Sequence, residues 1–122
     1  MHADPRLETT ESARPDELVL MLFEGAVRFG RQAVAAYDAG RADAEASVER
    51  VRAILQELDR NLDRRAGTIG RHLGAIYDYL LRRLAGPEVG RDAMSEVVSD
   101  IETLAQTWSV LVERRDAELA AA

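Results

Sequence analysis

The chain has 122 residues, of which 47% are hydrophobic and 31% are charged, a composition that suits one folded domain with a single core. Its formal net charge of −6 argues against a nucleic-acid binder and against electrostatic attachment to a membrane surface. All 16 basic residues are arginine and cysteine is absent, which excludes chemistry that needs a lysine amine or a thiol. The first residues do not resemble a secretory signal, and no apolar run approaches about 18 residues. We therefore expect a cytoplasmic protein without membrane insertion.

Residues 1–14 are polar and contain Pro5, and Leu7 is their only large aliphatic residue after the initiator. We predict a flexible N-terminal tail, because chain ends without apolar anchors are commonly mobile. The alternative is a tail that docks on the folded domain through Leu7.

The first predicted helix extends from Pro15, which suits the first helical position, to about Ala39, and Gly40 ends it with a left-handed cap. Its apolar residues form two faces. One face contains Leu18, Met21, Leu22, Ala26 and Phe29, and the second contains Leu20, Phe23 and Val27. A helix with two apolar faces must be covered twice. This helix is therefore either central in the fold or borders an unfilled groove.

Three further amphipathic helices are predicted. Asp43 caps one that continues to about Leu62, another extends from about Thr68 to Ala85, and the last begins after Asp92 and reaches at least Arg115. Their main apolar faces are Ala44, Val48, Val51, Leu55, Leu58 and Leu62; Ile69, Leu73, Ile76, Leu80 and Leu84; and Met94, Val97, Ile101, Leu104, Trp108 and Leu111. Four such helices with short connections predict an all-α, antiparallel four-helix bundle of up-down-up-down topology. We expect it to span residues 15–118, with a short C-terminal tail at 119–122.

Four glycines interrupt the predicted helices: Gly25 and Gly30 in the first, and Gly70 and Gly74 in the third. Each costs about 1 kcal/mol relative to alanine in a helix interior. One explanation is close approach of the first and third helices. The other is the low floor of a groove that receives another chain.

The sequence offers little for catalysis. A lone helical histidine, His72, raises the alternative of a histidine phosphotransfer domain, but Leu73 and Gly74 follow it and the chain has no lysine to stabilise a phosphoryl group. A di-iron centre would need a glutamate three residues before a histidine, and that position is Ile69. We predict no enzyme and no catalytic, cofactor or metal site.

More apolar residues are present than two helix seams require. The candidate groove residues are Leu20, Phe23, Val27, Val34, Tyr77, Leu81 and Trp108. A long apolar groove is the usual way in which a helical protein accepts an amphipathic partner helix. A self-associating bundle that forms a homodimer through the same surplus face is the alternative.

Two segments and one tryptophan carry a resemblance to a known family. Residues 13–29, ARPDELVLMLFEGAVRF, resemble the opening helix of the flagellin-specific export chaperones of the FliS family, with a pattern of roughly TASPxxLxxMLYDGAIRF. Residues 66–84, AGTIGRHLGAIYDYLLRRL, resemble that family's second signature, GGxIAxNLxxLYDYMLRRL, and Trp108 matches a tryptophan late in the last helix. The chain departs from these patterns at Arg14, Phe23 and His72, which replace a serine, a tyrosine and an asparagine.

The resemblance implies a helical bundle without enzymatic activity. It also implies binding to the C-terminal segment of new flagellin in the cytoplasm, protection of that segment from premature polymerisation, and delivery to the export gate of the flagellar type III apparatus. Family members carry a tyrosine in an N-terminal lid over the binding surface. This chain has none there, which leaves Leu7 as the candidate lid residue.

Overall fold

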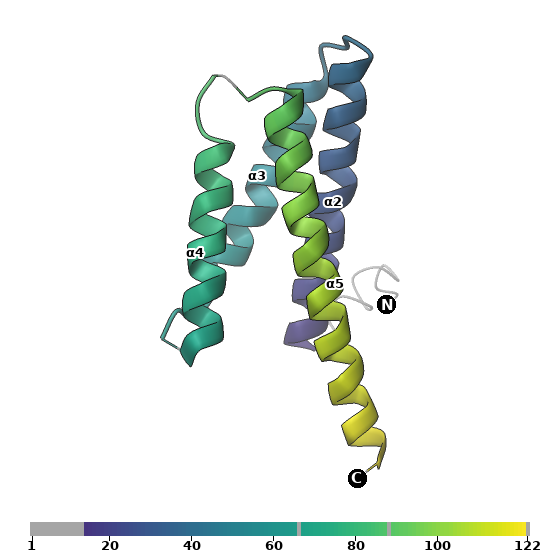
Figure 1. Ribbon diagram of the computed structural model, residues 1–122, viewed down its shortest axis with the longest axis vertical. Helices are drawn as coiled ribbons and strands as arrows, with labels where there is room; N and C mark the ends of the chain where they lie inside the picture. Colours follow the sequence, from purple (N-terminus) through teal and green to yellow (C-terminus); the bar gives the residue numbers. More distant parts are fainter. Residues whose placement is uncertain (1–13, 66, 88, 122) are drawn as a thin grey trace, which may run out of the picture.

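The computed structural model describes residues 14–65, 67–87 and 89–121 (Figure 1). These ranges contain no strand and form four α-helices: α2 (Pro15–Asp38), α3 (Ala44–Arg60), α4 (Gly67–Arg83) and α5 (Arg91–Ala121). Successive helices run in opposite directions in Figure 1. The predicted all-α four-helix bundle is therefore confirmed. Within the described ranges, no helix combines the length and the apolar character that a membrane crossing requires.

The ends of α2 follow from its sequence. Pro15 is the first helical residue, after Arg14 in an extended conformation that makes no side-chain cap. At the other end Gly40 adopts φ 65°, and the amides of Gly40 and Arg41 donate to the carbonyl oxygens of Tyr37 and Ala36. This pair of hydrogen bonds is the Schellman arrangement, which satisfies carbonyl groups left open by the helix end.

The C-terminal end differs from the prediction. Helix α5 continues to Ala121, whereas the sequence predicted a tail from residue 119. The last residues, Ala117 to Ala121, are mostly alanine with Glu118 and Leu119, and these have high helix propensity. The end of α5 projects beyond the other helices (Figure 1).

Helix α2 is the centre of the bundle, because it packs along both α3 and α5, whereas α4 packs on α3 and touches α5 only slightly. The core combines residues from all four helices. Its fully buried large side chains are Phe23, Val51, Leu55, Tyr77, Leu80, Leu84, Met94, Val97 and Ile101. Every predicted helix contributes to this list, so the main apolar patterns of the sequence do specify the core.

Two residues of the predicted seams are not covered. Ile69 in the first turn of α4 is 61% exposed, and Leu111 in the second half of α5 is 44% exposed. Helices α4 and α5 diverge toward these parts of their length (Figure 1). The buried side of α4 is centred instead on Leu73, Tyr77 and Leu80. Leu73, Leu80 and Leu84 of the predicted face are buried, but the buried side is shifted from Ile69 toward Tyr77, because α4 packs mainly on α3 and only slightly on α5.

The glycines have two different roles. A Cβ at Gly30 would overlap Val98 Cγ2 of α5, and one at Gly70 would overlap the carbonyl oxygen of Asp63. At Gly74 a Cβ would lie 3.0 Å from the Arg64 guanidinium. Gly30 allows α5 to pack closely on α2, and Gly70 and Gly74 allow the α3–α4 connection to pack closely on α4. The prediction that these glycines bring the first and third helices together is therefore wrong. A Cβ at Gly25 would meet Ile54 Cδ1 at 3.6 Å and Arg28 Nη2 at 3.8 Å, both ordinary contacts.

Candidate partner-binding groove

An apolar groove with a volume of about 780 Å³ lies along the N-terminal half of α2, where it is bordered by all four helices. We call it the α2 groove. Its larger apolar lining residues are Leu18, Met21, Leu22 and Phe29 of α2, Ile54, Leu58 and Leu62 of α3, Leu73 and Tyr77 of α4, and Trp108 of α5. A volume of this size falls within the range of roughly 300–1,000 Å³ typical of binding sites.

The groove exists because α2 carries more apolar surface than its neighbours cover. Met21 is 42% exposed, and Leu18, Leu22 and Phe29 are partly exposed although they lie on one helical face. Gly25 lies on the same face, four residues after Met21 and four before Phe29, and it also lines the groove. Because Gly25 has no side chain, no atoms fill the groove between Met21 and Phe29.

Three aromatic side chains lie together at the groove, two in its lining and one beneath them. Phe23 is fully buried, and its ring centroid lies 6.4 Å from that of Tyr77 and 6.0 Å from that of Trp108, with an edge-on orientation to the tryptophan. Trp108 Nε1 donates a hydrogen bond of 2.7 Å to the carbonyl oxygen of Asp16. The partly exposed Trp108 therefore presents apolar surface to the groove, and the buried Phe23 and Tyr77 support it.

The start of α2 is tied to α5 by a group of charged side chains. Arg115 donates to the carboxylates of Asp16, Glu17 and Asp116, the last two at 3.2 Å and 2.7 Å, and Arg14 pairs with Asp116 at 3.2 Å. Burial alone would raise the pKa of Asp16, but the hydrogen bond and the charge of Arg115 outweigh it and lower that pKa below its ordinary value. This network fixes the first turn of α2 to α5.

The α4 wall is held by Arg64 from the connection before it. Arg64 makes a two-point contact with Asp78, at 2.8 Å and 3.0 Å, and also pairs with Asp59 of α3. Its guanidinium lies over Gly74. The hydrogen bond from Arg64 lowers the pKa of Asp78, so the pair stays ionised at neutral pH. Arg64 thus fixes α4 against α3.

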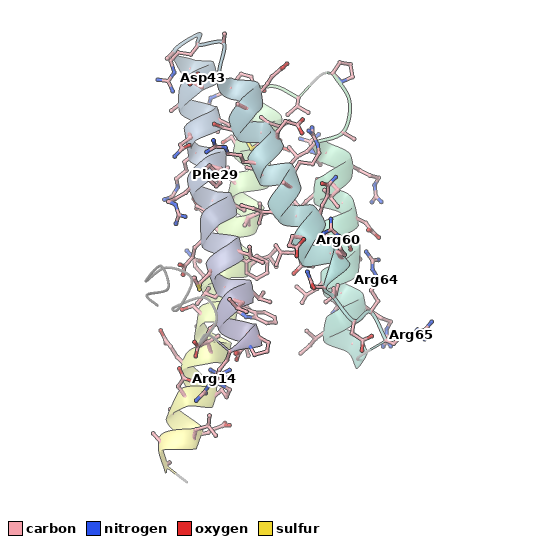
Figure 2. All side chains as sticks on the ribbon, turned by 180° about the vertical axis from the view of Figure 1, so that it is seen from behind. Arg14, Phe29, Asp43, Arg60, Arg64 and Arg65 are labelled. Atoms are coloured by element: carbon pink, nitrogen blue, oxygen red, sulfur yellow. The ribbon has the colours of Figure 1, made fainter. Side chains whose placement is uncertain are left out.

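Polar groups lie at the edge of the groove. The guanidinium of Arg50 lies over the ring of Phe29, with 5.0 Å from Cζ to the ring centroid, which suits a cation–π contact. Figure 2 shows Phe29 on α2. Arg28, Glu57 and Asn61 also line the groove. An apolar centre with a polar edge is the usual anatomy of a protein-binding surface.

The residues predicted for the groove are distributed unevenly. Tyr77 and Trp108 line it, and Phe23 supports both from below. Val27 is 8% exposed in the core, and Val34 and Leu81 pack partly buried against that core. Leu20 is half-buried outside the groove lining, and Leu7 lies outside the described residues.

The sequence therefore interchanged the two faces of α2. The face with Phe23 and Val27 was predicted to stay open, but Tyr77, Trp108 and α5 cover it. The open face is the one with Leu18 and Met21, from which no residue was predicted for the groove. Gly25, which lies on that face, was the signal that could have identified it.

The described residues contain no cluster of histidine, aspartate and glutamate side chains that could hold a metal ion. His72 is exposed on α4 and does not line the α2 groove. The groove itself is mainly apolar, and this favours binding over catalysis.

Comparison with known proteins agrees with this geometry. The family described as "Flagellar protein FliS" matches residues 3–115. The chain belongs to the FliS family. A relative named "Flagellar secretion chaperone FliS" from Bacillus subtilis (strain 168) is 31% identical over 115 residues, which cover 88% of this chain and 84% of the relative. The resemblance inferred from the two sequence motifs and Trp108 is thus confirmed. Membership of a chaperone family points to a protein that acts by binding and not by catalysis.

Proposed function

We propose that this FliS-family chain is a cytoplasmic chaperone that binds the C-terminal segment of flagellin in the α2 groove. The observation that carries the proposal is an apolar groove that remains open between four helices of a chain from a flagellar chaperone family. Removal of apolar side chains such as Met21 and Leu18 from water by a partner lowers the free energy of the complex.

The dimensions of the groove favour a helical occupant. It extends along α2 from Pro15 to Phe29, which corresponds to about 21 Å, or about four helical turns. An amphipathic helix of this length would place one apolar side chain per turn between α2 and the aromatic pair Tyr77 and Trp108.

A segment that is disordered alone and helical when bound fits such a surface, since the groove supplies the apolar contacts that the isolated segment lacks. Ordering the segment costs about 2–5 kcal/mol or more, which a long contact surface can offset. While bound, the segment's apolar face is unavailable for polymerisation. Delivery of the complex to the export gate of the flagellar type III apparatus completes the proposed role.

The test is a titration of the full chain with the C-terminal segment of its flagellin, followed by calorimetry at several temperatures. Tight binding with a negative heat-capacity change is expected, because apolar surface is buried. Met21→Asp should weaken binding by roughly 10-fold or more, since burial of a methionine side chain contributes about 1.5–3 kcal/mol. The control is Val110→Asp, at a position on α5 with a similar exposure of 47% that lies outside the groove.

Equal loss of affinity in both variants, or none in Met21→Asp, would refute the groove assignment. Phe23→Asp cannot serve as a binding probe, because it places a charge in a fully buried position and is expected to unfold the chain. The proposed role of Leu7 as a lid residue is tested by comparing the rate of flagellin binding of the parent chain with that of Leu7→Ala. If Leu7 covers the groove in the free protein, the variant binds flagellin faster.

A further inference from the structure

The positive charge of this acidic chain is concentrated around α4. Residues 60–83 contain six arginines and two aspartates, an excess of four positive charges in a chain whose net charge is −6. Figure 2 shows Arg60, Arg64 and Arg65 gathered where α3 ends and α4 begins, on the side of the molecule away from α2. The remainder of the chain is correspondingly more acidic.

The outer side of α4 carries part of this charge in a line. Arg71, Ala75 and Arg82 follow each other at helical spacing, so they lie on one face, and all three are exposed. Tyr79 lies beside them and is 46% exposed. This face points away from Leu73, Tyr77 and Leu80, which form the buried side of the helix.

Internal ion pairs engage Arg60, Arg64 and Arg83 but leave the other three arginines of this segment. Arg64 is engaged by Asp59 and Asp78, and Arg83 pairs with Glu96. Within the described ranges, by contrast, Arg71 donates only to the Thr68 hydroxyl, at 3.3 Å, and Arg65 and Arg82 have no carboxylate within ion-pair distance. Asp78, the only acidic residue of α4, is already bound by Arg64.

The helix dipole explains only some of them. Arg82 and Arg83 are in the last turn of α4, where positive charge is favourable. Arg65 precedes the helix and Arg71 lies near its start, where the dipole disfavours positive charge, and the first turn has no acidic residue. Neither the helix dipole nor an ion pair therefore accounts for the arginines at positions 65 and 71.

We propose that the basic α4 face, formed by Arg65, Arg71, Tyr79 and Arg82, is a docking surface for an acidic segment of a second protein. The four side chains offer guanidinium donors for carboxylates and one aromatic ring for an apolar contact. A long nucleic acid is disfavoured, because the rest of the chain carries excess negative charge and would repel it. The face is on the opposite side of α4 from the α2 groove, so both surfaces can be occupied together. This simultaneous occupancy, but not the acidic docking itself, rests on the proposed flagellin binding.

The test uses a polyglutamate peptide of 17 residues, the length of α4, and the intact chain at low salt. Binding is measured by fluorescence anisotropy, and hydrogen exchange locates the contact. Arg71→Glu/Arg82→Glu is expected to weaken binding by roughly 10-fold or more, since it replaces two attractive charges by repulsive ones. The control, Arg41→Glu/Arg114→Glu, changes the net charge equally at exposed positions on other elements and should retain most of the affinity.

Protection from hydrogen exchange is expected on α4. The affinity for polyglutamate is expected to stay unchanged when the flagellin segment fills the α2 groove.

Equal weakening of polyglutamate binding in both double variants would show a general charge effect and overturn the proposal. Tighter binding of a single-stranded DNA of equal charge would overturn the choice of an acidic protein. Self-association of the parent chain that Arg71→Glu/Arg82→Glu abolishes would identify a second copy as the occupant and also overturn it. Competition between polyglutamate and the flagellin segment would place both ligands on one surface and contradict the separate sites. If only flagellin fails to bind, the proposed function is refuted and the polyglutamate result still stands.

Discussion

Gly25 and Gly30 lie five residues apart in the same helix, yet the structure predicts opposite effects of replacing each by alanine. At Gly25 the new methyl group would make an ordinary contact of 3.6 Å with Ile54 Cδ1. At Gly30 it would overlap Val98 Cγ2, which belongs to a β-branched and therefore stiff side chain in α5. The comparison separates a glycine that keeps a groove low from one that lets two helices pack.

The magnitudes follow from helix propensity and packing. Alanine is favoured over glycine by about 1 kcal/mol in a helix interior, so Gly25→Ala should stabilise the chain by about 0.5–1 kcal/mol. Gly30→Ala gains the same propensity but adds an overpacking cost of about 1–3 kcal/mol. Its expected net effect is destabilisation by roughly 0–2 kcal/mol.

Thermal and urea unfolding of the two variants and of Val98→Ala provide the assay. Gly25→Ala should raise the Tm by roughly 2–6 °C. In the Val98→Ala background the overlap is removed, so Gly30→Ala should there become stabilising by up to about 1 kcal/mol. The sign of the Gly30→Ala effect therefore depends on residue 98.

A Gly30→Ala chain that is more stable than the parent when Val98 is present would refute the packing explanation. So would a Gly25→Ala chain that is clearly less stable, because the space beside Gly25 would then not be open. The proposed flagellin binding gives an independent check, since a larger side chain, as in Gly25→Leu, should obstruct the α2 groove that Gly25 lines.

Two predictions concern pH. Burial, together with the charge of Asp59, raises the pKa of Tyr77 to about 12 from 10.0, so its contribution to stability is complete below pH 10 and is lost as pH rises toward 12. Tyr77→Phe should flatten this alkaline loss in unfolding measurements, and an equally steep loss would contradict the assignment. The hydrogen bond from Arg64 lowers the pKa of Asp78 below 3.8, so that contribution is present above about pH 4 and is lost on acidification. Asp78→Asn should therefore reduce stability at pH 7 and make the acid loss shallower; unchanged acid sensitivity would count against the Arg64 contact.

Much of the fold could be predicted because local signals agree with it. Pro15 marks the start of α2 and Gly40 its end, and apolar spacing places residues such as Leu55 and Ile101 in the core. These features depend on backbone preferences and helical periodicity, which a sequence displays directly.

Helical periodicity alone did not identify the open face of α2, because both of its apolar faces have helical spacing. Which one is covered depends on where α4 lies, and that depends on contacts between distant residues. Arg64 binds Asp78 across Gly74, and the Asp63 carbonyl fills the space beside Gly70, so α4 is drawn onto α3 and away from α5. Tyr77 and Trp108 were nevertheless among the residues predicted for a groove, and both line the α2 groove.

The position of Trp108 makes the chain its own optical reporter. It is the only tryptophan in the sequence, and it lines the α2 groove with its indole N–H directed to the carbonyl oxygen of Asp16. Excitation selective for tryptophan therefore samples one location, at the junction of α2 and α5. A ligand that fills the groove removes water from this ring, whereas one that binds the outer side of α4 does not approach it. Emission of the unlabelled chain can thus distinguish occupancy of the two surfaces.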